Sequence, residues 1–220
     1  MIVGKLVESA ALQIKSSLIG GGFVREQYTT KEFGSACMQY IKKFGALKSL
    51  TKYEHPKNLH WDDATYTGDA YGTYAWAVYV AEVSVDTSTA EVRVEDFVAV
   101  QEVGKVVNPV MAAGQIEGGV AQGIGFALYE NVVWREGRMA NGQMTNYIMP
   151  TSMDVPPIRV YFEENPYARG PAGAKGIGEL PLDGTAPAIA NAIAFATGAD
   201  VRRIPVTSES LLEMLERVHV

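Results

Sequence analysis

The chain has 220 residues, of which 47% are hydrophobic, and its 19 lysines and arginines stand against 25 aspartates and glutamates. This apolar content is enough for one large or two small globular domains and excludes a disordered chain. The formal net charge of −6, without any basic run, argues against a nucleic-acid or anionic-membrane partner, because such surfaces are bound through basic faces. We expect neither partner.

The cysteine and histidine content argues against a metal site built from this chain alone. The single cysteine, Cys37, cannot form an internal disulfide, and His55, His60 and His219 lack the spacing of metal ligands. Charge follows the N-terminus too early for a secretory signal, and no uncharged apolar stretch reaches the roughly 18 residues of a membrane span. These features predict a cytoplasmic chain without metal ligands of its own and without a membrane anchor.

Two amphipathic helices are predicted near the N-terminus. In the first, apolar residues recur at three-to-four spacing from Val3 to Leu18 and end at three consecutive glycines. The second begins at Thr29, whose side chain can cap the helix while Glu32 reaches back. Its apolar face predicts that Cys37 is a core residue and not a reactive thiol. That face consists of Phe33, Cys37, Ile41 and Phe44.

The remaining elements predict the fold class. Alternating apolar residues over 75–103, interrupted by a polar turn at 86–89, predict a long antiparallel hairpin. Further strands are predicted over 144–149 and 158–163, and helices over 187–198 and 208–215. Because helices and hairpins do not alternate regularly, we expect an α+β fold of mixed helices and antiparallel hairpins, not a doubly wound parallel sheet.

A glycine-rich segment over 114–130 breaks the usual design of a helix. Its apolar residues keep helical spacing, yet the glycines inside it each cost about 0.5–1 kcal/mol relative to alanine. Either another backbone packs closely there, or a bulky ligand needs the space. Gln115 and Gln122 would share one helical face, which suits a polar ligand and equally suits solvated glutamines. The interior glycines are Gly118, Gly119, Gly123 and Gly125.

A second glycine-rich segment, 170–181, surrounds Lys175 and Glu179. Its glycine spacing resembles that of a phosphate-binding loop, but it lacks the Gly-Lys-Ser/Thr ending. A nucleotide-binding function is therefore the weaker hypothesis for this segment. Glu179 stands between a glycine and a Leu-Pro pair, where partial burial could raise the pKa of a general base. A plain exposed turn residue is the alternative.

Taken together and in order, six blocks of this sequence resemble the molybdenum hydroxylases, the xanthine dehydrogenase/aldehyde oxidase family. The resemblance covers almost the whole chain. It implies that residues 1–220 form the C-terminal portion of a molybdopterin-binding domain, because a complete molybdenum-binding subunit of this family is several times longer. The blocks are residues 68–71, 103–109, 114–123, 147–150, 154–156 and 173–179.

The resemblance also implies an activity and a set of site residues. The activity would be hydroxylation of an N-heterocycle such as a purine, or of an aldehyde, with oxygen derived from water. Glu179 matches the family's general base, and Gln115 matches a glutamine beside the metal that can hydrogen-bond its oxygen ligand. The other expected cofactor contacts are Gly118, Gly119, Gln122, Lys175 and Gly176.

The implied cofactors and partners lie largely outside this chain. Molybdenum–molybdopterin would be shared with the remaining molybdopterin-binding subunit, while [2Fe–2S] clusters and FAD would sit on an iron–sulfur and a flavin subunit. Because Glu179 and Gln115 supply only one wall of the site, we expect the isolated chain to bind no cofactor tightly and to catalyse nothing. The alternative is a non-catalytic structural or assembly module that keeps the fold.

Overall fold

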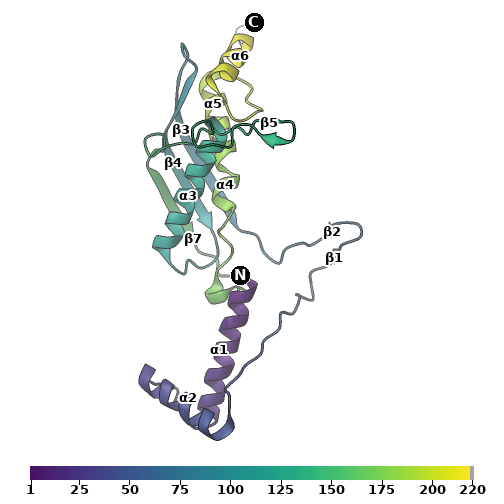
Figure 1. The fold of residues 1–220 in the computed structure, drawn as a ribbon, viewed down its shortest axis with the longest axis vertical. Coiled ribbons are helices and arrows are strands. Elements are labelled where there is room, and N and C mark those ends of the chain that lie inside the picture. Colours follow the sequence, from purple (N-terminus) through teal and green to yellow (C-terminus); the bar gives the residue numbers. More distant parts are fainter. Residues whose placement is uncertain (219–220) are drawn as a thin grey trace. The chain divides into compact units, whose positions relative to one another are not determined.

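The structure is a computed structural model that describes residues 1–218, with side chains through residue 217, so His219 lies outside the described residues. The chain divides into two compact units, each with its own internal contacts (Figure 1). The first unit comprises residues 1–74 and 166–175, and the second comprises residues 75–165 and those from 176 onward. Among the described residues, no helix combines the length and the apolar content needed to cross a lipid bilayer.

The first unit contains the two predicted N-terminal helices, α1 (Ile2–Gly20) and α2 (Thr30–Phe44). The predicted cap of α2 is confirmed: the Thr29 hydroxyl accepts from the Glu32 amide at 3.3 Å, and the Glu32 carboxylate accepts from the Thr29 amide at 2.6 Å. These reciprocal bonds satisfy amides that the first turn of a helix leaves without partners. The unit also holds a small hairpin of β1 (Trp61–Asp62) and β2 (Thr67–Gly68), and a 3-10 turn, η1 (Pro171–Gly173).

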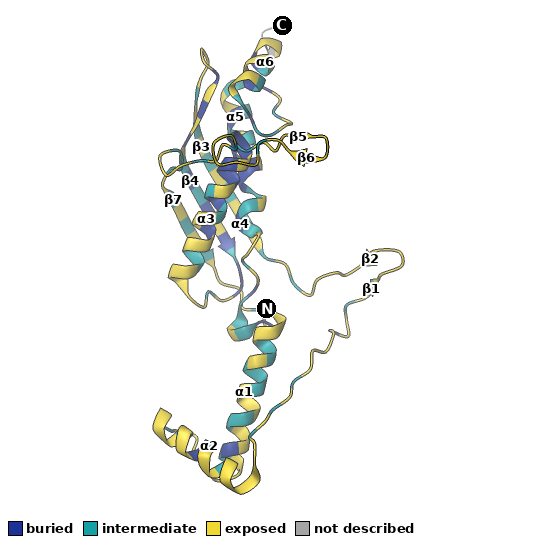
Figure 2. Ribbon diagram, viewed as in Figure 1, coloured by how far each residue is buried: buried dark blue, intermediate teal, exposed yellow. Residues whose placement is uncertain are grey.

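The predicted buried face of α2 is wrong in part (Figure 2). Ile41 is 43% exposed and Phe44 is 60% exposed, while Cys37 is half-buried. The aromatic residues pack mainly on one another, with the Phe23 ring 6.0 Å from the Phe44 ring between centroids. Since α2 meets little apolar surface within its unit, its periodic apolar face is only partly covered.

The second unit is built on a three-stranded sheet of order β3-β4-β7. Strands β3 (Trp76–Asp86) and β4 (Glu91–Glu102) form the predicted antiparallel hairpin, in which Val78 pairs with Val100. Strand β7 (Ile158–Glu163) is confirmed, but it pairs with β4 in the parallel direction. The sheet is therefore mixed and not purely antiparallel, within the α+β fold that was expected.

The strand predicted over 144–149 is wrong. In the described structure this segment is a turn, in which the Gln143 carbonyl accepts from the Asn146 amide at 3.0 Å and from the Tyr147 amide at 2.9 Å. The Asn146 side chain also accepts from the Gln143 amide at 3.0 Å. These local bonds occupy the backbone groups that a strand would offer to a neighbour.

Helices cover one face of the sheet (Figure 1). The glycine-rich helix α3 (Pro109–Leu128) is capped by Asn108, whose side-chain oxygen accepts from the Met111 amide at 3.1 Å. It is followed by the hairpin of β5 (Trp134–Arg135) and β6 (Arg138–Met139), and by α4 (Leu180–Asp183), α5 (Thr185–Thr197) and α6 (Ser208–Val218). The largest fully buried core side chains in this unit include Phe97, Ile116, Val120, Ile124, Ile189, Ile193 and Leu211.

Two glycines of α3 make room for the chain that follows Glu179. A Cβ atom at Gly119 would lie 2.5 Å from the Cγ atom of Pro181, and one at Gly123 would lie 2.5 Å from the Cβ atom of Thr185. Close backbone packing is therefore the correct explanation for these two glycines. It seats α4 and the start of α5 directly on α3.

The variants Gly123→Ala and Gly118→Ala should change stability in opposite directions. A methyl group at Gly123 would collide with the fully buried Thr185, so we expect a loss of about 1–3 kcal/mol in the free energy of unfolding. At Gly118 nothing lies within 4 Å of the new atom, so the better helix former should add up to about 1 kcal/mol. Urea unfolding followed by circular dichroism measures both, and equal effects would contradict the packing described here.

Candidate functional site

The two glycine-rich segments meet in the second unit. The side-chain amide of Gln115, on the exposed side of α3, donates a hydrogen bond to the Gly178 carbonyl at 3.1 Å, although the two residues are 63 apart in the sequence. Gly178 directly precedes Glu179. The structure thus brings together the two residues that carried most of the functional expectation.

The Glu179 side chain is exposed, while its backbone is fixed by hydrogen bonds. Its carbonyl accepts from the Leu182 amide at 2.9 Å, and it stands immediately before α4 with φ −93° and ψ −26°. Its side chain does not turn back to cap that helix. Among the described side chains and amides, none donates a hydrogen bond to the Glu179 carboxylate, which leaves its acceptor sites available to a ligand.

Four glycines of α3 and of the loop that carries Glu179 leave open space next to the main chain. A Cβ atom built at any of four glycines, two on α3 and two in the Glu179 loop, would meet nothing within 4 Å. Such positions let a bulky group approach the main chain itself. The side chain of Gln115 links the two segments through its bond to the Gly178 carbonyl. We call this set of residues the bare face; it consists of Gly114, Gln115, Gly118, Gly176 and Gly178.

The other expected contacts have different surroundings. Gln122 is exposed on α3 and lines a groove of about 740 Å³ together with Met149 and Pro150. At Gly119 the space that a side chain would occupy is taken by the ring of Pro181. Lys175 belongs to the first unit, where it is nearly buried and its ammonium donates to the Tyr74 carbonyl at 2.9 Å.

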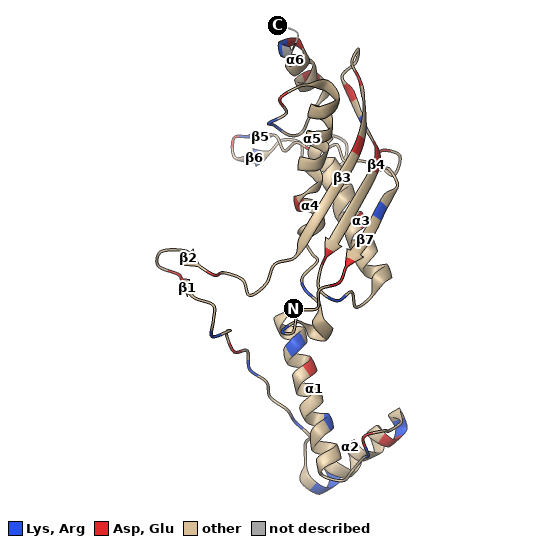
Figure 3. Cartoon of the chain, turned by 180° about the vertical axis from the view of Figure 1, so that it is seen from behind, with Lys and Arg blue, Asp and Glu red and all other residues tan. Residues whose placement is uncertain are grey.

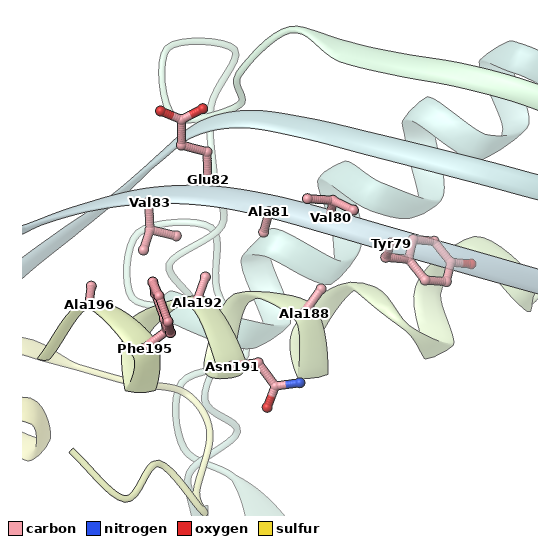
Figure 4. Close-up of a pocket in the computed structure, with 10 residues that line it drawn as sticks. All are labelled: Tyr79, Val80, Ala81, Glu82, Val83, Ala188, Asn191, Ala192, Phe195 and Ala196. Carbon is pink, nitrogen blue, oxygen red and sulfur yellow. The ribbon is translucent and has the colours of Figure 1, made fainter. Parts of the chain in front are cut away.

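Sequence reasoning missed Tyr79, which holds the loop from the sheet. Its hydroxyl donates to the carbonyl of Leu180, and its ring leaves no room for a side chain at Gly184, where a Cβ atom would lie 2.1 Å from the ring. In Figure 4, Tyr79 lies at one end of a groove of about 560 Å³ between β3 and α5. The only sequence signal was its inward position in the alternating pattern of its strand.

Burial raises the pKa of Tyr79 above that of a free tyrosine. The polar side chain of Gln101 lowers the pKa of Tyr79 in part, and the nearby negative charge of Asp183 raises it further. Gln101 is completely buried, and neither its side-chain nitrogen nor its side-chain oxygen forms a hydrogen bond of good geometry with a described group. At neutral pH the Tyr79 hydroxyl is protonated, as any tyrosine below its ordinary pKa of about 10 is, and the raised pKa keeps it a donor further into the alkaline range.

Charge and metal ligands are scarce around the bare face. Helix α3 carries a single charged side chain, Glu117, and is mostly uncharged in Figure 3. Across the described residues, no three His, Cys, Asp or Glu side chains come close enough together to hold a metal ion. The groups that this surface offers to a ligand are the Gln115 amide, the Glu179 carboxylate and the main chain at the glycines.

Comparison with known proteins identifies the family. Residues 2–156 match the family model of the molybdopterin cofactor-binding domain. The chain belongs to this family. The matched region contains Gln115, Gly118 and Gln122, whereas Glu179 lies beyond it.

The related proteins include aldehyde oxidoreductases and a xanthine dehydrogenase subunit. An aldehyde oxidoreductase of Megalodesulfovibrio gigas is 35% identical over 158 residues, which are 71% of this chain and 17% of that protein. A xanthine dehydrogenase molybdenum-binding subunit of Escherichia coli O157:H7 is 33% identical over 141 residues, 63% of this chain and 19% of that protein. The crystal structure of the aldehyde oxidoreductase from Desulfovibrio desulfuricans superposes with a TM-score of 0.75 and 30% identity, over 96% of this chain and 22% of that one.

These comparisons confirm the family expected from the sequence blocks and the fold class. The chain spans about a fifth of the length of the curated relatives it matches. Most of each relative therefore has no counterpart here.

The raised pKa of Tyr79 predicts a loss of stability at alkaline pH. Because the native state holds the Tyr79 proton more tightly than the unfolded chain, this contribution is complete below the ordinary tyrosine pKa of about 10 and is lost as the pH rises through the native value. The free energy of unfolding, measured between pH 9 and 11, should fall less steeply in Tyr79→Phe than in the unaltered chain. Equal slopes would show that Tyr79 is not buried in this way.

Proposed function

We propose that this chain supplies one wall of the active site of a molybdenum hydroxylase, with Glu179 as the general base. The observation that carries the proposal is the exposed carboxylate of Glu179, which accepts no hydrogen bond from any described residue and whose backbone is held directly after Gly178 of the bare face. An ionised carboxylate in this setting can accept a proton from a ligand placed against the bare face. Membership of the molybdopterin cofactor-binding domain family supports the same role.

The bare face suits molybdenum–molybdopterin as a ligand. When bound, this cofactor supplies the two-electron oxidation and oxygen transfer that amino-acid side chains lack. Gly114 and Gly118 would let it approach the main chain, and Gln115 would offer its side-chain oxygen and its second amide hydrogen, since one hydrogen is used by Gly178. Glu179 would take up a proton at its carboxylate during hydroxylation of the substrate.

For the substrate we propose an aldehyde or an N-heterocycle such as a purine, hydroxylated with oxygen derived from water. The relatives named aldehyde oxidoreductase and xanthine dehydrogenase support these two classes. The neutral Gln115 and the carboxylates of Glu179 and Glu117, at a helix that carries no positive side chain, fit an uncharged carbonyl or ring better than an anion.

For the partners we propose the remaining molybdopterin-binding polypeptide, an iron–sulfur subunit and an FAD subunit in a cytoplasmic complex. The outer face of the sheet supports a protein partner, because it exposes Trp76 at 70% and Val78 at 62%, together with Val80 and Tyr161. Such adjacent apolar side chains are typical of surfaces that another chain covers. Residues 1–220 would then be the C-terminal portion of the cofactor-binding domain.

Replacing the proposed base tests this function in the molybdenum-loaded complex. Glu179→Gln keeps the shape of the side chain and removes its basicity, so we expect turnover to fall by about 10²–10⁴-fold. Molybdenum content and melting temperature should stay unchanged. Glu213→Gln, on the exposed side of α6, is the matched control and should retain full turnover.

Unaltered turnover in Glu179→Gln, with molybdenum content intact, would contradict the proposal. It would favour the alternative in which this chain is a non-catalytic structural or assembly module. A nucleotide-binding function would instead require a rise in melting temperature on addition of nucleotide, which we do not expect.

Metal analysis of the isolated chain makes a separate prediction. Because the bare face, Gln115 and Glu179 form a single wall, we expect the purified chain to carry far less than one molybdenum atom per molecule. Elemental analysis of the chain alone and of the assembled complex gives the comparison. Near-stoichiometric molybdenum in the isolated chain would show that it holds the cofactor without partners.

A further inference from the structure

The backbone around Glu179 is held at four consecutive carbonyl groups. The Gly178 carbonyl accepts from Gln115 on α3 at 3.1 Å, and the Glu179 carbonyl accepts from the Leu182 amide at 2.9 Å. The next two carbonyls accept from the Tyr79 hydroxyl on β3 and, at 2.7 Å, from the Thr185 hydroxyl on α5. Elements on both sides therefore fix the loop, while the Glu179 carboxylate forms no hydrogen bond with the part of the chain that the structure describes.

The contact from the sheet depends on an accurately placed ring. The Tyr79 ring packs against the fully buried Phe97 with 6.2 Å between centroids, and it lies against the chain at Gly184. Only a residue without a side chain fits at Gly184, because a Cβ atom there would lie 2.1 Å from the ring. The core thus sets the position of the hydroxyl, and the hydroxyl sets the position of the Leu180 carbonyl.

We propose that Tyr79 is a positioning residue for Glu179: its hydroxyl holds the Leu180 carbonyl and thereby fixes where the neighbouring carboxylate stands. This inference deepens the proposed function and rests on it for the catalytic part. Gln115 holds the other side of the same residue, so Glu179 is placed between two side-chain donors that come from different elements.

The hydroxyl is separable from the packing of the ring. Tyr79→Phe keeps the ring and its contact with Phe97 and removes the hydroxyl, which is the donor to the Leu180 carbonyl. A purely structural tyrosine would stabilise the whole unit, whereas a positioning tyrosine acts on one loop and through one carboxylate. The two roles therefore predict different patterns of change.

Hydrogen exchange on the complete chain tests the hold on the loop without any cofactor. In Tyr79→Phe we expect the Leu182 amide and its neighbours over 178–182 to exchange about 3- to 10-fold faster, as the loss of one hydrogen bond predicts. Amides of α3 and β4 should keep their rates. Unchanged exchange over 178–182, or an equal rise throughout the second unit, would overturn the proposal.

Two further variants complete the hydrogen-exchange experiment, one as a second disruption of the contact and one as a control. Gly184→Ala should push the ring away and loosen the same loop, so it tests the proposal even if Tyr79→Phe folds poorly. Tyr129→Phe is the matched control, a half-buried tyrosine at the end of α3 that should leave exchange over 178–182 unaltered. An effect of Tyr129→Phe equal to that of Tyr79→Phe would contradict a specific role for Tyr79.

A double-mutant cycle in the molybdenum-loaded complex tests the catalytic part. Tyr79→Phe should lower kcat by about 10-fold with little change in KM, because a misplaced base loses more in the transition state than in substrate binding. In a Glu179→Gln background the same change should have no further effect, and additive losses would overturn the positioning role. If Glu179→Gln alone leaves turnover intact, the proposed function fails, while the exchange experiment still decides whether Tyr79 holds the loop.

Discussion

The close approach of α3 to the start of α5 is the contact on which the rest of the site depends. Gly119 and Gly123 remove the side chains that would keep Pro181 and Thr185 at a distance. The cost of glycine in a helix, about 0.5–1 kcal/mol each, is offset by the packing that this approach permits. Without it, the loop that carries Glu179 would not lie within hydrogen-bonding reach of α3.

The same helix packs against the following chain on one side and leaves open, on the other, the surface that we propose for a ligand. Gly119 and Gly123 face inward, whereas Gly114 and Gly118 leave the outer surface open. Hydrogen bonds to the backbone then hold the loop, and no donor among residues 1–217 reaches the Glu179 carboxylate. The proposed general base requires this arrangement, in which the backbone is held and no described residue occupies the acceptor sites of the carboxylate.

Periodicity could predict the local elements but not how they meet. The hairpin over 75–103 followed from alternation, while the failed strand over 144–149 shows that side-chain bonds within a turn override an apolar pattern. For the glycines, spacing could not separate Gly118, which is open, from Gly119, which is packed, because the neighbours come from a distant segment. The role of Tyr79 could not be predicted for the same reason, since its hydrogen-bond partner, Leu180, lies about a hundred residues away along the chain.

A solved structure of this chain within its molybdenum-loaded complex is the most direct test of the account. We expect the cofactor to lie against the bare face, with the Glu179 carboxylate turned toward it and the Tyr79 hydroxyl still bonded to Leu180. A carboxylate directed into bulk water, with the cofactor held on another surface of the assembly, would contradict the account.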